Sequence, residues 1–151
     1  MSQAPITHED IAAISSDFWS SMVGLPISLV DNLTEQGCNE EGIFGQIEIR
    51  GAWTGTVELR ASRTLAWATA AALLDKPSTL VTVEESFDAI QEATNIVAGS
   101  IKRLLPPICK MAIPAMSGCS SLAPPSQCSG RVSAFFKSRG GELTISVVHE
   151  G

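Results

Sequence analysis

The sequence predicts an α+β fold in which an antiparallel sheet of about six strands packs against three helices. Segments that alternate between apolar and polar residues occur in pairs joined by short turns, as in β-hairpins. Three other segments carry apolar residues at helical spacing, and each begins with a helix-capping residue. The 151 residues, of which 44% are hydrophobic and 17% charged, suit one globular domain over residues 1–151.

The composition excludes several classes of function. The net charge of -6 leaves no basic surface for phosphate backbones, so nucleic acid is not an expected partner. The longest apolar run, Leu65 to Leu74, is too short to span a membrane. The N-terminus, MSQAPITHED, lacks the basic start and apolar centre of a signal peptide. We therefore expect a cytoplasmic protein with no membrane partner.

The four cysteines predict neither a metal site nor a redox motif. Cys38, Cys109, Cys119 and Cys128 have no C-x-x-C spacing, and the chain has only two histidines. Reduced thiols are expected in the cytoplasm, although the spacing leaves a disulfide between Cys119 and Cys128 open. The phosphate-loop, GxSxG, HExxH and dinucleotide-binding motifs are all missing from the sequence.

The first predicted helix runs from about His8 to Met22. It begins at a capping box, because Thr7 is followed three residues later by Asp10, and Gly24 marks its end. A short strand over residues 26–31 and a polar loop are expected to follow.

The next segments predict a hairpin and a second helix. Residues 43–50 and 54–60 alternate around a turn at residues 51–53, each with one polar side, so the sheet should be antiparallel and covered on one face. Ser62 is a suitable N-cap for a helix that extends to Leu74, and Pro77 follows it.

The longest predicted helix covers residues 82–105. Thr82 and Glu85 form a second capping box, and Pro106 and Pro107 end the helix. At about 100° per residue, seven of its residues form one stripe that can pack against a sheet. These residues are Phe87, Ile90, Thr94, Val97, Ala98, Ile101 and Leu105.

Three further segments complete the predicted sheet. Residues 110–115 read as a strand that Pro114 interrupts, and residues 116–130 as a Gly/Ser/Pro-rich loop. This loop is either a connector or a border of a partner-binding face. Residues 132–136 and 143–147 alternate again, with a turn at residues 139–142, and predict a hairpin.

The side of the long helix opposite its apolar stripe has an unusual composition. Asp88, Glu92, Asn95, Gly99 and Lys102 form a row at spacings of three or four residues. Asn is a weak helix former, and Gly in a helix costs about 1 kcal/mol relative to Ala. The row is either a solvated face or a surface on which Gly99 lets another chain approach. Ile96, at the rim of this row, would then also touch that chain.

A resemblance favours the second interpretation. The run Glu92-Ala-Thr-Asn95-Ile-Val-Ala-Gly99-Ser-Ile-Lys102 resembles the Glu-x-x-Asn helix of the CheX/CheC/FliY family of bacterial chemotaxis phosphatases, and is closest to CheX. The family fold agrees with the order of elements predicted here. Asp17, Ser20 and Gly24 repeat the spacing of Glu92, Asn95 and Gly99, as if from a decayed second motif, but the first two depart from the family residues and we assign them no catalysis.

The resemblance implies a function and its residues. It implies a phosphatase for the aspartyl phosphate of a CheY-like receiver domain, in which Asn95 orients the attacking water and Glu92 pairs with a lysine of the receiver. Asp88, Ile96, Gly99 and Lys102 would contact the receiver, with a solvated role open for Asp88 and Lys102. The receiver would bring the magnesium ion, so no cofactor of the chain's own is expected.

A non-enzymatic function is the alternative. A domain of the same fold could bind a receiver, or another copy of itself, and catalyse nothing. The resemblance also implies a homodimer formed through the sheets of two copies.

Overall fold

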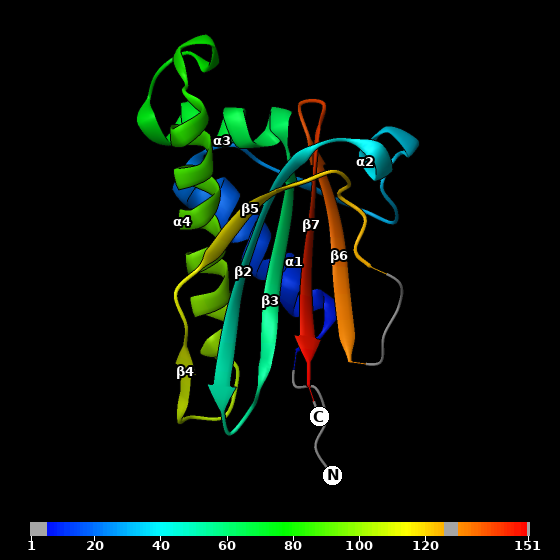
Figure 1. The fold of residues 1–151 in the computed structure, drawn as a ribbon, viewed down its shortest axis with the longest axis vertical. Coiled ribbons are helices and arrows are strands. Elements are labelled where there is room, and N and C mark those ends of the chain that lie inside the picture. Colours follow the sequence, from blue (N-terminus) through cyan, green and yellow to red (C-terminus); the bar gives the residue numbers. More distant parts are fainter. Residues whose placement is uncertain (1–5, 126–129, 151) are drawn as a thin grey trace.

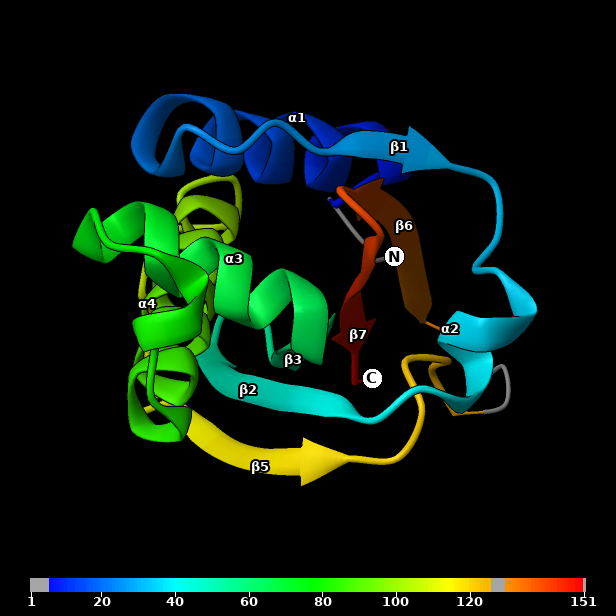
Figure 2. The ribbon, with the colours of Figure 1, turned by 90° about the horizontal axis from the view of Figure 1, so that it is seen from above.

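A curved antiparallel sheet forms one side of the protein, and the three longest helices cover one face of that sheet (Figures 1 and 2). The structure is a computed structural model that describes residues 6–125 and 130–150. Within these residues the sheet has seven strands, in the order β1-β6-β7-β3-β2-β4, and β5 also pairs with β2. The strands are β1 (Ser28–Val30), β2 (Gly42–Gly51), β3 (Gly55–Ser62), β4 (Cys109–Met111), β5 (Ala115–Cys119), β6 (Arg131–Ser138) and β7 (Gly141–His149).

The three predicted helices share one core with the sheet. Apolar side chains from α1, α3, α4 and the inward side of the strands pack in a single buried cluster, which confirms the α+β fold with helices on one face. The helical segments are α1 (His8–Asp17), the π-helix η1 (Phe18–Val23), α2 (Glu35–Asn39), α3 (Arg63–Leu74), the 3₁₀-helix η2 (Ser78–Leu80) and α4 (Val83–Lys102).

The capping residues mark the helix starts correctly. Both capping boxes form, at Thr7 with Asp10 and at Thr82 with Glu85, and Ser62 accepts a hydrogen bond from the backbone N–H of Leu65 at 3.2 Å. The predicted helix over residues 8–22 is not uniform, because it widens into the π-helix η1 after residue 17.

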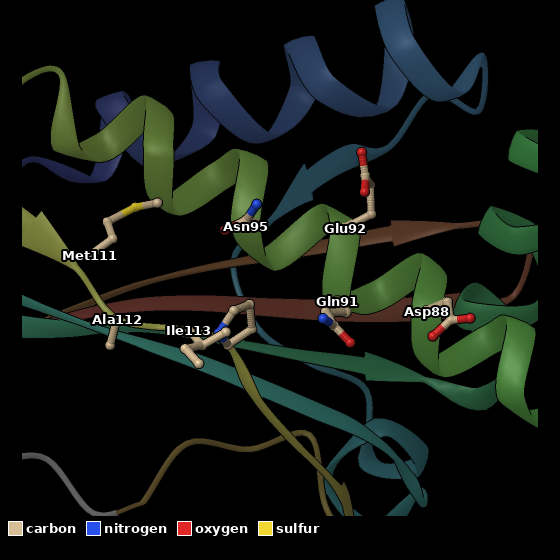
Figure 3. Close-up of a pocket in the computed structure, with 8 residues that line it drawn as sticks. Asp88, Gln91, Glu92, Asn95, Met111, Ala112 and Ile113 are labelled. Atoms are coloured by element: carbon tan, nitrogen blue, oxygen red, sulfur yellow. The ribbon is translucent and has the colours of Figure 1, made fainter.

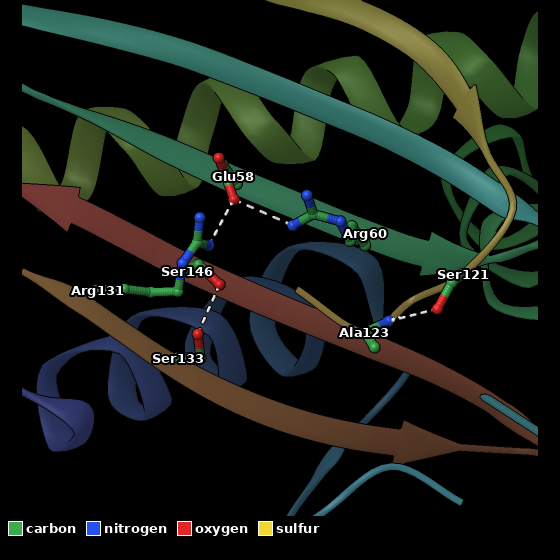
Figure 4. Close-up of polar contacts among 7 residues, drawn as sticks. All are labelled: Glu58, Arg60, Ser121, Ala123, Arg131, Ser133 and Ser146. Carbon is green, nitrogen blue, oxygen red and sulfur yellow. Dashed lines mark hydrogen bonds and ion pairs between the residues drawn. The ribbon is translucent and has the colours of Figure 1, made fainter. Parts of the chain in front are cut away.

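The other face of the sheet is mostly polar, as the alternation predicts, and three of its charged side chains form a cluster (Figure 4). Glu58 accepts hydrogen bonds from Arg60 at 3.1 Å and from Arg131 at 2.8 Å. The hydroxyl groups of Ser133 and Ser146, on β6 and β7, lie 2.7 Å apart. These contacts satisfy polar groups that the sheet partly buries.

Two segments differ from the sequence-based prediction. Residues 115–119 form the strand β5 along β2, so the loop predicted from residue 116 begins too early. Its Ser and Gly residues show no alternation, and the strand is stabilised by backbone pairing that only the tertiary structure provides. The polar loop after β1 contains the short helix α2, which Thr34 caps. Glu142 of β7 accepts hydrogen bonds from the backbone N–H and the hydroxyl of Thr34 at 3.1 and 2.9 Å.

The last hairpin forms as predicted, with a tighter turn. Ser138 pairs with Gly141, and the two residues between them, Arg139 and Gly140, have φ angles of 49° and 82°. Two successive positive φ angles are typical of the type I′ turns that match the twist of hairpin strands. Residues 126–129 of the loop, with Cys128 and the open question of its disulfide, lie outside the described residues.

Candidate functional site

The helix α4 presents two different faces. The residues of the predicted apolar stripe are buried, apart from Phe87, which is half-buried. On the opposite face Asp88, Glu92 and Asn95 are exposed. Because the helix is regular from residue 83 to 102, the side chains of Glu92 and Asn95 project from adjacent turns on the same side.

A glycine on β2 allows α4 to lie close to the sheet at the turn that carries Asn95. A Cβ added at Gly45 would lie 2.5 Å from the side-chain oxygen of Thr94. That hydroxyl donates a hydrogen bond to the backbone carbonyl of Ile90 at 2.7 Å, so it is not free to move aside. A side chain at position 45 would therefore force this turn of α4, which also carries Asn95, away from the sheet.

A groove of about 610 Å³ runs along this exposed face. One wall is α4, and the other is the chain between β4 and β5 (Figure 3). The residues that line it are Asp88, Gln91, Glu92, Asn95, Met111, Ala112, Ile113 and Pro114.

The second wall exists because the edge of the sheet is interrupted. Met111 of β4 pairs with Ile49 of β2, and Ala115 of β5 pairs with Gln46. Three residues, 112–114, thus lie opposite only two, 47 and 48, which is the arrangement of a β-bulge. Pro114 has no N–H to donate to the ladder, and Ile113 is 85% exposed. The bulge turns this segment toward α4. In other proteins β-bulges often lie next to active sites and redirect a side chain there.

The polar groups of the groove are available for a ligand. Among the described residues, none donates to or accepts a hydrogen bond from the side chains of Asp88, Glu92 or Asn95, and none forms an ion pair with them. A carboxylate and an amide one turn apart, both open to solvent, can together bind a cation and hold a water molecule.

Comparison with known proteins identifies the family. The family model for the chemotaxis phosphatase CheX matches residues 43–135, which is more than half of the chain. The chain belongs to the CheX family. No curated protein matches it significantly in sequence.

Solved structures agree with this assignment at the level of the fold. Chemotaxis protein CheX from Vibrio vulnificus is similar with a TM-score of 0.79 and 22% identity over 99% of this chain and 100% of its own. A CheC-like superfamily protein from Shewanella sp. PV-4 gives 0.77 and 22% over the full length of both chains. CheX from Borrelia burgdorferi, solved in a complex with CheY, BeF3 and Mg²⁺, gives 0.70 and 13% over 95% of this chain and 97% of its own.

The CheX motif residues and the predicted partner-binding residues do not all lie in the groove. Glu92, Asn95 and Asp88 line it. Gly99 lies one turn beyond Asn95, and a Cβ added there would meet no atom within 4 Å, so the surface is open at that point. Ile96 is half-buried and packs against the core.

Five of the eight residues that line the groove were not predicted as site residues from the sequence. Gln91 lies three residues after Asp88 and four before Asn95, so its spacing alone could have placed it on this face. The wall formed by residues 111–114 could not be placed, because the sequence reveals Pro114 but not the strand against which the bulge forms. Lys102, at the end of α4, is half-buried and does not line the groove.

The described residues hold neither a metal-binding cluster nor a membrane-spanning helix. No group of three or more His, Cys, Asp and Glu side chains among them is arranged to hold a metal ion. Within residues 6–125 and 130–150, no helix has the length and the apolar composition that crossing a membrane requires.

Proposed function

We propose that this CheX family member hydrolyses the aspartyl phosphate of a CheY-like receiver domain. The observation that carries the proposal is the pair formed by Glu92 and Asn95, exposed on one face of a regular helix, without partners among the described residues, and beside an open groove. The family assignment supports the reaction class, and the CheX of Borrelia burgdorferi in complex with CheY supports the kind of partner.

Asn95 is the group that would act on the attacking water. Its amide accepts one hydrogen bond from the water and donates another to it or to the phosphoryl group, which directs an oxygen lone pair at phosphorus. The water oxygen forms a bond to phosphorus, the bond between phosphorus and the aspartate oxygen breaks, and inorganic phosphate and a free carboxylate result. Positioning of this kind accounts for much of the catalysis of phosphoryl transfer.

Glu92 would bind and orient the receiver. Its carboxylate accepts hydrogen bonds from a lysine of the receiver, and this fixes α4 over the phosphorylated site. The open surface at Gly99 lets the backbone of the receiver approach, while Asp88, Ile96 and Lys102 contact it around the pair. The magnesium ion is the receiver's and, when bound there, neutralises charge on the phosphoryl group.

Phosphate decay tests this proposal. Candidate receiver domains are loaded with a small phosphodonor, and the loss of phosphate is followed with wild-type protein and with Asn95→Ala. We expect at least one receiver to lose phosphate faster with the wild-type protein than with the variant. Equal rates for every cytoplasmic receiver would reject the enzymatic function.

The competing proposal is a non-catalytic domain that binds a receiver or another copy of itself. We also propose that the protein forms a homodimer. The sheet ends at β4, which pairs on one side only within the described residues, and Ile108 next to it is 87% exposed. A second copy could pair with this edge. Receiver binding that is equal for wild type and Asn95→Ala, with no hydrolysis by either, would favour the module, and sizing in solution tests the dimer.

A further inference from the structure

A second groove lies between α4 and α3. These two helices pack side by side (Figure 1). It has a volume of about 290 Å³, and we call it the α3–α4 groove. Its lining residues are Ala70, Leu73, Leu74, Glu85, Asp88, Ala89 and Glu92.

The α3–α4 groove is continuous with the candidate site. Asp88 and Glu92 line both grooves. Along a helix, seven residues rise about 10 Å, which is the axial separation of Asp88 from Asn95. A domain of about 100 residues has a radius of gyration of about 13 Å. A receiver that places its phosphorylated aspartate at Asn95 is therefore wide enough to reach Asp88 and the α3–α4 groove.

The chemistry of the α3–α4 groove defines what it can bind. Leu73 and Leu74, at the end of α3, are 38% and 48% exposed, and they provide an apolar surface. Glu85 is neutralised by Lys76, whose Nζ lies 2.7 Å from its carboxylate. Asp88 and Glu92 form no ion pair with any of the described residues, so two unpaired carboxylates border the apolar surface.

We propose that the α3–α4 groove is a second docking site for the same receiver domain. It takes an apolar side chain of the receiver that is flanked by a lysine or arginine, and the basic group faces Asp88. The groove contributes to affinity and to the choice of receiver, and not to the chemical step. This inference rests on the function proposed above, because it assigns a second contact to the same partner.

Substitution of Leu74 tests the proposal. The receiver that responds best to the wild-type protein is loaded with beryllofluoride and Mg²⁺, and its dissociation constant is measured. We expect Leu74→Gln to raise this constant about tenfold, because the variant loses the burial of an apolar side chain, and Leu74→Met to restore it. The rate of phosphate loss at saturating protein should be the same for all three proteins.

A control at Leu29 separates docking from nonspecific effects, and a variant at Asp88 tests the charged part of the contact. Leu29 on β1 is 47% exposed and lies outside both grooves, so Leu29→Gln should leave receiver affinity unchanged. Asp88→Asn should weaken binding at low salt by about two- to fivefold and reduce its salt dependence. Equal thermal unfolding of the variants excludes a loss of fold.

The outcomes for the two proposals are distinct. If the wild-type protein hydrolyses the phosphate and Leu74→Gln binds the receiver equally well, the docking site is refuted and the phosphatase stands. If the protein binds the loaded receiver without hydrolysis, the phosphatase fails, and the affinities of the Leu74 variants still decide the docking site. If no CheY-like receiver binds, both proposals fail.

Discussion

Two helical segments carry an acid, a polar residue and a glycine at the same spacing, but only the acid and the polar residue of the second segment line the groove of the candidate site. In α4, Glu92, Asn95 and Gly99 lie on one regular helix. In the first segment the helix changes to the π-helix η1 at residue 18, so Asp17 and Ser20 no longer have the angular relation of an α-helical pair.

The glycines of the two segments differ as much as the polar pairs. Gly99 is inside a helix and leaves an open surface. Gly24 has a φ of 80° and ends the segment as a left-handed cap. Asp17 also accepts a hydrogen bond from the hydroxyl of Ser21 at 3.3 Å. The carboxylate of Glu92 accepts no hydrogen bond from the described residues, so it can bind a partner. Equal spacing in the sequence gives equal geometry only where the helix is regular.

A large difference between the two segments should come from their acids. We expect Glu92→Gln to lower the efficiency of receiver dephosphorylation about 10- to 100-fold, because a hydrogen bond to a charged group contributes about 1.5–3 kcal/mol. Asp17→Asn should leave it unchanged. Rates measured over a range of receiver concentrations check this, and an equal loss in both variants would show that the first segment is also a site.

The regular geometry of α4 depends on its close packing against β2. Gly45→Ala should destabilise the protein by about 1–3 kcal/mol, because the new methyl group overlaps the Thr94 hydroxyl. Gly118→Ala, on the neighbouring strand β5, is the matched control, since its nearest neighbour lies at 3.8 Å. Denaturant unfolding measures both. Equal stabilities would mean that α4 can move away from the sheet without cost.

Gly99 and Gly24, the glycines of the two compared segments, should respond in opposite ways to substitution by alanine. Gly99→Ala should stabilise the protein by up to about 1 kcal/mol, because alanine favours the helix and nothing obstructs the methyl group. Gly24→Ala should destabilise it by about 1 kcal/mol, since a positive φ is strained for alanine. Thermal unfolding measures both changes.

A second readout of Gly99→Ala separates stability from function. The same variant should bind the receiver less tightly, because the methyl group occupies the surface that the partner approaches. A stabilised variant with undiminished binding would show that the glycine is only tolerated, and that this face is solvated.

The smallest expected effect concerns the start of α4. The hydrogen bond from Lys76, and next that from the backbone of Thr82, lower the pKa of Glu85 below its ordinary value. A carboxyl group with a lowered folded pKa stabilises the protein above its unfolded pKa, and this contribution is lost as the pH falls through the folded value. Glu85→Gln and Lys76→Gln should therefore both flatten the acid limb of the stability curve. An unchanged acid limb would mean that this ion pair is not maintained in solution.

Local signals in the sequence predict the parts of the fold that depend on neighbouring residues. Thr82 and Ser62 locate the starts of α4 and α3, and the alternation of residues 132–147 locates the last hairpin. The π-helix η1 and the bulge at Pro114 depend on packing and on a partner strand far away in the sequence. For the same reason the motif located Glu92 and Asn95, whereas the wall opposite them and the α3–α4 groove needed the tertiary structure.

A single-turnover measurement of phosphate loss at saturating protein tests the role of Asn95. This experiment separates the chemical step from binding. We predict that Asn95→Ala slows the saturated rate by about 100-fold or more and leaves the affinity for the loaded receiver unchanged, and that Ser20→Ala changes neither. A saturated rate for Asn95→Ala equal to that of the wild-type protein would contradict the assignment of the water to this amide.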